Sequence, residues 1–330
     1  MATEKYLTLS DGRTLAYEDV GDPSSSLLVI FLHGVFGVGT APVVLSPVFI
    51  EKRAHHITPT LAGWGESSPH SPSKSYVDAL TSDMTELITH LHPNTADLRI
   101  YISGGSYGSV PAQMLYGAPF DKFPLGRNIA GCLLLAPFSP FKWHKEYTKS
   151  MTWMNYISVG PPSRILPFQP LQRIAILGLS MKLRSVDDAE AMIRQLLFDH
   201  ATPEEREAFA RWREQRGLEE GVFERSMAKG MFKSISKSWA GFIEVSDVVH
   251  SDWGFCPDQL DDEHTDGRPM MIAASAQDDL GPDMANWLKE NYKNSKLKWV
   301  PGKHLSTLYE LDNLWADLLE NEPSPSPAGL

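Results

Sequence analysis

The feature that most constrains this chain is a Gly-x-Ser-x-Gly pentapeptide, residues 104–108, which directly follows an apolar run at residues 98–102. The apolar run predicts a short buried strand. A strand that turns at once into a helix strains its central residue, so small residues are needed on both sides. The turn exposes the hydroxyl of Ser106 at a helix N-terminus, where free N–H groups, including that of Tyr107, can stabilise an oxyanion. The sequence therefore predicts a nucleophilic serine between a strand and a helix.

A second motif lies upstream, where the apolar residues 27–32 end in His33 and Gly34. Their β-branched composition predicts a fully buried parallel strand. Together with the pentapeptide, this His-Gly strand end resembles the α/β-hydrolase superfamily, in which the following loop supplies a second oxyanion-hole N–H. The resemblance implies that Val35 is this donor. We expect His33 to be a structural loop histidine that hydrogen-bonds the backbone.

The resemblance also implies the chain order nucleophile, acid, histidine. Residues 269–274 predict another buried strand, and Asp278 and Asp279 lie in the loop after it. Asp278 fits the position of the acid best. Asp279 is the alternative, because the side chains of adjacent loop residues diverge and only one should reach an imidazole. The last predicted strand, residues 297–300, is followed by His304, which we expect to be the general base.

The order of the predicted elements indicates an α/β fold. Short strands alternate with amphipathic helices up to residue 137, which is typical of a mostly parallel sheet flanked by helices. Helical periodicity dominates residues 138–254. The resemblance implies an α-helical cap here, inserted into an α/β-hydrolase core that comprises residues 1–137 and 255–330 and ends in a loose tail.

Three helices are predicted inside the insertion, at residues 187–200, 204–215 and 222–239, and the second has Thr202 as its N-cap. Aromatic residues crowd the edges of the insertion. They are candidates for lining a substrate pocket, and the alternative for each is packing of cap against core. The candidates are Phe36, Trp143, Trp153, Trp239 and Trp253.

Composition restricts the partners and the compartment. The formal net charge of -11 argues against binding to nucleic acid or to an anionic membrane, because both require concentrated Lys and Arg. Two cysteines imply no disulfide framework, and no H-E-x-x-H motif or cysteine cluster suggests a metal. A hydrolase of this type needs no cofactor. Without a signal-peptide or membrane-spanning run, we expect a cytoplasmic protein with a small-molecule substrate.

These observations predict a serine hydrolase that cleaves a small to medium, largely apolar ester or related acyl compound through an acyl-enzyme. A prolyl-type aminopeptidase is an alternative, since residues 104–109 resemble the Gly-Gly-Ser-Trp-Gly-Ser elbow of those enzymes. A peptidase would need an acidic residue such as Asp252 or Glu244 to bind a free amine. C–C bond hydrolysis and acyl transfer use the same triad. A non-catalytic small-molecule receptor on the same fold is the alternative of another class.

Overall fold

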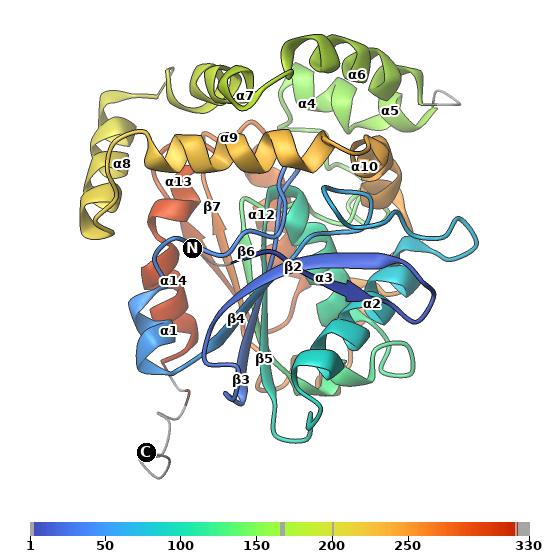
Figure 1. The fold of residues 1–330 in the computed structure, drawn as a ribbon. Coiled ribbons are helices and arrows are strands. Elements are labelled where there is room, and N and C mark those ends of the chain that lie inside the picture. Colours follow the sequence, from blue (N-terminus) through green and yellow to red (C-terminus); the bar gives the residue numbers. More distant parts are fainter. Residues whose placement is uncertain (1–2, 166–168, 200, 321, 323–330) are drawn as a thin grey trace.

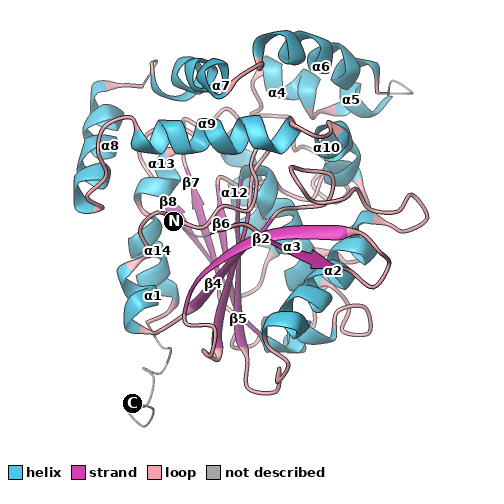
Figure 2. Ribbon diagram, viewed as in Figure 1, coloured by secondary structure: helices cyan, strands magenta, loops and turns pink. Residues whose placement is uncertain are grey.

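A single mixed sheet of eight strands forms the centre of the computed structural model, which describes residues 3–165, 169–199, 201–320 and 322 (Figures 1 and 2). The strand order is β1-β2-β4-β3-β5-β6-β7-β8. β2 runs antiparallel to both β1 and β4, and all other neighbours are parallel. The strands are β1 (Lys5–Thr8), β2 (Thr14–Gly21), β3 (Leu27–Leu32), β4 (His55–Pro59), β5 (Arg99–Gly105), β6 (Ile129–Leu135), β7 (Met270–Ala274) and β8 (Ser295–Trp299).

Alternate residues of the central strands enter two separate hydrophobic cores, because successive side chains of a strand point to opposite faces. In β3, Leu28 and Ile30 belong to one core, whereas Leu27 and Val29 belong to the other. This two-sided burial confirms the prediction for residues 27–32. The first core is closed by α2 (Tyr76–Leu91), α3 (Ser109–Gly117) and α12 (Pro282–Asn291), and the second by α1 (Pro47–Glu51) and α14 (Leu311–Leu318).

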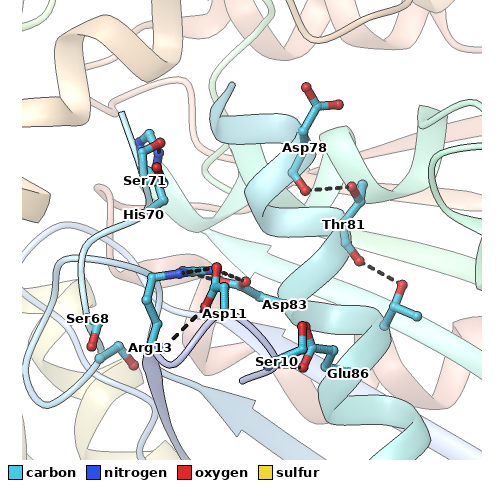
Figure 3. Close-up of polar contacts among 12 residues, drawn as sticks. Ser10, Asp11, Arg13, Ser68, His70, Ser71, Asp78, Thr81, Asp83 and Glu86 are labelled. Carbon is cyan, nitrogen blue, oxygen red and sulfur yellow. Dashed lines mark hydrogen bonds and ion pairs between the residues drawn. The ribbon is translucent and has the colours of Figure 1, made fainter. Parts of the chain in front are cut away.

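The antiparallel hairpin at the edge of the sheet is fastened to α2 by polar contacts (Figure 3). Arg13 donates from Nη1 to Oδ2 of Asp83 at 2.9 Å, and from Nε to Asp11 at 2.9 Å. Ser10 donates from its backbone N–H and its hydroxyl to the carboxylate of Glu86, both at 2.7 Å. Because Asp83 is buried, its charge requires such a partner. The hairpin is thus tied to the rest of the molecule by charge as well as by strand pairing.

Between β6 and Cys256, every regular element that the structure describes is a helix, and these helices lie over the end of the sheet toward which β7 points (Figure 1). α9 crosses above the strands, and α4, α5 and α6 lie farther out. The helices are α4 (Trp153–Ser158), α5 (Pro161–Ile165), α6 (Pro170–Lys182), α7 (Val186–Ile193), α8 (Pro203–Gln215), α9 (Val222–Ile235) and α10 (Ala240–His250), with a π-helical turn, η3 (Arg194–Phe198).

These helices differ in detail from the predicted ones. The N-cap of α8 is confirmed: Thr202 Oγ1 accepts the N–H of Glu205, whose carboxylate accepts the N–H of Thr202 at 2.8 Å. The predicted helix 187–200 changes after Ile193 into the π-helical turn, and residue 200 lies outside the described residues. The predicted helix 222–239 ends at Ile235, and α10 starts where the Ser238 hydroxyl accepts the N–H of Ala240.

Short elements complete the described structure. None of the described helices is both long and apolar enough to cross a membrane. The predicted loose tail after Glu320 falls, except for Glu322, outside the described residues. The remaining helices are α11 (Asp262–Thr265) and α13 (Ser306–Tyr309), and the 3-10 turns are η1 (Ser106–Gly108), η2 (Pro124–Asn128) and η4 (Pro257–Gln259).

Candidate active site

Ser106 lies at the end of β5, in a turn too tight for ordinary residues. Its φ of 52° lies in the left-handed region, which is costly for a residue with a side chain. A Cβ at Gly104 would overlap the carbonyl oxygen of Gly108, and a Cβ at Gly108 would overlap that of Leu32. The glycines therefore allow the strand to pass directly into η1 and α3, which leaves Ser106 at the tip of the turn.

A hydrogen-bond network anchors the turn to the neighbouring strand. Ser109 Oγ donates to the carbonyl oxygen of Ser106 at 2.6 Å and accepts the N–H of Phe138 at 3.0 Å. Gln113 Nε2 donates to the carbonyl oxygens of both Ser109 and Phe138, at 3.0 and 2.8 Å. All of these groups are buried or partly buried. The strained serine is thus held by bonds from α3 and from the loop after β6.

The loop after β3 packs against the serine turn. A Cβ at Gly34 would lie 3.2 Å from the carbonyl oxygen of Gly105 and 3.5 Å from Ser106 Cβ. His33 Nε2 accepts the N–H of Leu61 at 3.0 Å, and its Nδ1 donates to the carbonyl oxygen of Gly34 at 2.8 Å. Burial lowers the pKa of His33 to about 4, so the ring is neutral. The expectation that His33 is a structural histidine is confirmed. Gly34 and Ser106, which lie close together here, are followed in the sequence by Val35 and Tyr107.

Asp278 and His304 form a hydrogen-bonded pair in the loops after β7 and β8. His304 Nδ1 donates to Asp278 Oδ2 at 2.7 Å, and the Asp278 side chain is only 4% exposed. Asp278 Oδ1 accepts the N–H of Leu280 at 2.9 Å. Asp279 is exposed. Of the two adjacent aspartates, Asp278 is therefore the one that contacts the imidazole.

The pKa of His304 reflects two opposing effects. Burial disfavours the charged ring and lowers its pKa, but the hydrogen bond and the negative charge of Asp278, with the charge of Asp279, outweigh burial. The pKa is raised above its ordinary value of 6.5. With the proton on Nδ1 held by Asp278, the lone pair of the neutral ring lies on Nε2, where a general base needs it.

The histidine loop is held from two sides, by contacts that the sequence did not predict. Ser275 Oγ donates to the carbonyl oxygen of Gly302, which joins the loop to the loop that carries Asp278. Glu205 Oε1 accepts the N–H of Lys303 at 2.6 Å, which joins the loop to α8. The T-x-x-E spacing signals the capping box, but the bond to residue 303 spans 98 positions and leaves no local pattern.

Two of the five aromatic candidates meet at the boundary between the sheet loops and the helices. The ring of Phe36, a residue with a φ of 60°, lies 6.4 Å from that of Trp239 and 5.1 Å from that of Phe242, between ring centroids. It also lies 6.2 Å from the ring of Trp64. Because Phe36 follows Val35 directly, this aromatic cluster adjoins the loop against which Ser106 packs.

The other three candidates occupy different positions. Trp253 is 2% exposed and donates to the carbonyl oxygen of Val248 at 3.3 Å, so the packing alternative holds for it. Trp143 is partly buried and donates to the carbonyl oxygen of Phe255 at 2.8 Å. Trp153 is 73% exposed on α4, where it stacks on Tyr156. No described ring contact joins these three residues to Phe36 or Trp239, although Trp253 belongs to the hydrophobic core against which Phe36 packs.

Both acidic residues considered for binding a substrate amine have cationic or basic partners. Asp252 forms an ion pair with Lys142, and Glu244 Oε1 lies 3.3 Å from Nε2 of His70. The Glu244 pair raises the pKa of His70, because the carboxylate favours the charged ring. Within the described part of the chain, no group of three or more His, Cys, Asp or Glu side chains is placed to hold a metal ion.

Comparisons with known proteins agree with this architecture. The model of a family described as the alpha/beta hydrolase family matches residues 29–310. The search of curated proteins gave no match. An alpha/beta hydrolase fold protein from Chitinophaga pinensis is 14% identical, with a TM-score of 0.60 over 98% of each chain. A hydrolase from Pseudomonas aeruginosa PA01 is 15% identical, with a TM-score of 0.59 over 96% of this chain and 98% of that one. A thermophilic esterase from Thermogutta terrifontis is 15% identical, with a TM-score of 0.54 over 97% of this chain and 98% of that one.

Proposed function

The chain belongs to the alpha/beta hydrolase family, and from that premise we propose that it is a serine hydrolase of small to medium, largely apolar esters or related acyl compounds. Ser106 is the nucleophile, His304 the general base and Asp278 the acid that orients it. The observation that carries the proposal is the 2.7 Å bond from His304 Nδ1 to a buried Asp278, in the loops that follow the serine turn in chain order. The similarly folded protein from Thermogutta terrifontis is an esterase, which agrees with this reaction class.

The reaction proceeds in two half-reactions. His304 Nε2 takes the hydroxyl proton of Ser106 while Oγ bonds to the acyl carbon, and Asp278 stabilises the imidazolium. The N–H groups of Val35 and Tyr107 bind the carbonyl oxygen as it becomes negatively charged. The imidazolium then protonates the leaving alcohol, whose bond to the acyl carbon breaks. Water, activated by the same histidine, attacks the acyl-enzyme, and the serine hydroxyl and a carboxylic acid are released.

We also propose that residues 138–254 form a cap over this site, while residues 1–137 and 255–330 form the core. The position of α9 above the strands supports this division (Figure 1). Phe36 from the core and Trp239 and Phe242 from the helical segment share one aromatic contact. An apolar boundary next to the oxyanion loop favours an apolar acyl or alcohol group over a charged one.

The two candidate amine ligands differ in how fully their carboxylates are engaged. Asp252 pairs with Lys142, which argues against its binding an α-amino group. Glu244 contacts His70 through Oε1, but its buried Oε2 has no hydrogen-bond partner among the described residues, so the aminopeptidase alternative would use Glu244. Acyl transfer and C–C bond hydrolysis use the same triad and differ in the acceptor or the bond cleaved. A non-catalytic receptor would bind the same ligands without turnover.

The proposal is tested with short-chain p-nitrophenyl esters and the Ser106→Ala variant. We expect ester turnover that falls at least about 10³-fold in the variant, while its circular dichroism spectrum stays that of the wild type. An aminoacyl p-nitroanilide serves as the parallel peptidase substrate. Ester hydrolysis that persists in the variant would exclude Ser106 as the nucleophile, and saturable ester binding without turnover in the wild type would favour the receptor.

A further inference from the structure

The outer helices α4, α5 and α6 lie on the side of α9 that faces away from the sheet (Figure 1). Each of these helices exposes large apolar side chains. Ile174, Leu177 and Met181 are spaced three and four residues apart, so they share one face of α6. A soluble protein rarely exposes so many large apolar residues in neighbouring elements without a partner for them. The exposed fractions are 73% for Trp153, 74% for Met154, 75% for Ile165, 68% for Ile174, 65% for Leu177 and 58% for Met181.

The same segment is cationic, in contrast to the chain as a whole. Residues 149–186 contain five Lys and Arg residues and no Asp or Glu, although the formal net charge of the chain is -11. These 38 residues therefore carry +5, and the other 292 carry -16. All five cations are exposed: Lys149, Arg164, Arg173, Lys182 and Arg184.

We propose that this cationic apolar surface, formed by the described exposed side chains within residues 149–186, docks on the surface of an anionic lipid bilayer. Trp, Met, Ile and Leu side chains enter the boundary between head groups and acyl chains, while Lys and Arg bind the anionic head groups. Long cationic side chains keep their charged ends at the head groups while their stems lie along apolar surface. The α6 helix has an apolar face and also carries Arg173 and Lys182. This is the composition of an interfacial helix.

The overall negative charge does not oppose this docking. Charges are screened over about 8 Å at physiological ionic strength, so a bilayer interacts with the face that touches it rather than with the net charge of the chain. The expectation that excluded an anionic membrane used the whole-chain charge and took no account of this segregation. Three carboxylates lie at the margin of the surface. Asp187 pairs with Arg225, whereas Asp188 accepts the hydroxyl of Ser185 and the exposed Asp247 of α10 accepts the side-chain amide of Gln169, so these two keep their charges. The five cations outnumber them.

A second copy of the chain fits this surface less well. A two-fold symmetric contact places the same patch on both copies, so five cations would face five cations. Like charges opposed across an interface are unfavourable. An anionic bilayer neutralises them and accepts the apolar side chains as well, so both properties of the surface are satisfied by one partner.

The test is co-sedimentation of the full-length protein with phosphatidylcholine vesicles, with and without phosphatidylserine. We expect binding to the phosphatidylserine vesicles that weakens as salt is raised, and little binding to phosphatidylcholine alone. Arg164→Gln with Lys182→Gln should weaken binding roughly tenfold or more, because each cation near the surface contributes about fivefold. Ile174→Ser with Leu177→Ser should also weaken it.

Matched controls lie outside the surface. Leu196→Ser removes an apolar side chain that is 65% exposed in η3, and Arg211→Gln removes an exposed cation from α8, so both should bind as the wild type does. Ser106→Ala should also bind normally, because docking does not use the nucleophile, and a failure of the hydrolase proposal would leave this result intact. Absent or salt-insensitive vesicle binding would overturn the inference. A second result would also overturn it: the wild type forms a dimer in analytical ultracentrifugation and binds no vesicles, and the double variant Ile174→Ser, Leu177→Ser is a monomer.

Discussion

Ser106 and Phe36 each hold a left-handed backbone conformation, in the two loops that meet at the candidate site. Such a conformation costs about 1 to 3 kcal/mol for a residue with a side chain and persists only where the surroundings compensate. For Ser106 the compensation is visible in the bonds from Ser109 and in the glycines on either side. The two strained residues therefore lie in the loops that pack against each other at Ser106.

The two adjacent aspartates provide a test of the acid. Asp278→Asn should lower kcat roughly 10³- to 10⁴-fold, because an amide in place of the carboxylate destabilises both the tautomer and the imidazolium of His304. Asp279→Asn is the matched control and should change kcat little, since the Asp279 side chain is exposed. Steady-state kinetics on one p-nitrophenyl ester compares them. Equal losses in the two variants would contradict the assignment of Asp278.

The raised pKa of His304 predicts the pH dependence of catalysis. A general base must be unprotonated, so kcat/KM should increase with pH through a midpoint above 6.5, the ordinary histidine value. Asp279→Asn should move this midpoint slightly lower, because one of the negative charges that raise the pKa is lost. The pH profile of kcat/KM measures both. A wild-type midpoint below 6.5 would mean that burial outweighs Asp278.

At the scale of elements, the sequence predicted those helices and strands whose signals lie within the element itself. The residues of β3 and β7 are apolar and largely buried, and Thr202 marks the start of α8. The helices α4, α5, α6 and α10 were not assigned individually. α6 exposes much of its apolar surface, so the spacing of its apolar residues does not correspond to a face buried in the core.

The same distinction applies to the candidate site: some of its residues could be predicted from the local sequence, whereas others depend on contacts between distant parts of the chain. Ser106 and Asp278 each follow a buried strand, and His304 follows the edge strand β8, so strand-end motifs were enough to predict all three residues. The contacts of Glu205 and the enclosure of Trp253 depend on tertiary packing. No spacing in the sequence indicates that a helix 98 residues earlier binds the N–H next to His304.

Glu205 connects α8 to the histidine loop, and its substitution should therefore affect catalysis. Glu205→Gln leaves one carbonyl oxygen for two N–H donors, those of Thr202 and Lys303, so the loop should loosen. We expect kcat to fall roughly 10- to 100-fold with a smaller change in KM, because a displacement of about 1 Å at a catalytic group has effects of this size.

Glu207→Gln, on the same helix but 73% exposed at its side chain, is the control. Kinetics and thermal unfolding of both variants separate loop positioning from helix stability. If kcat is the same in the two variants, Glu205 does not position His304. If a lower melting temperature of Glu205→Gln accounts for the whole loss of activity, its role is structural.

At the scale of the whole molecule, buried histidines make stability depend on pH. Burial lowers the pKa of His33 and of His56 to about 4, and it also lowers the pKa values of His55 and His92, which share a 2.8 Å hydrogen bond. These rings bind protons less readily in the fold than in the unfolded chain, whose histidines become protonated below about pH 6.5. His304 acts in the opposite sense, since its raised pKa stabilises the fold at low pH.

The free energy of unfolding should therefore decrease as pH falls from 6.5 toward 4. His33 and His56 each contribute up to roughly 3 kcal/mol of stability at neutral pH that is lost over this interval. Urea unfolding at several pH values measures the slope, and His56→Phe should make it shallower, because the Nδ1 of His56 has no hydrogen-bond partner among the described residues. Stability that is constant or increases down to pH 5 would contradict the neutral buried histidines.

The most direct test of the central claim, an activated serine at residue 106, is covalent labelling by a fluorophosphonate probe followed by peptide mass spectrometry. We predict one modified residue, Ser106, in the folded wild type, and no label in Ser106→Ala or in heat-denatured protein. Folded protein that stays unlabelled, or that carries the label on another serine, would contradict the assignment of the nucleophile.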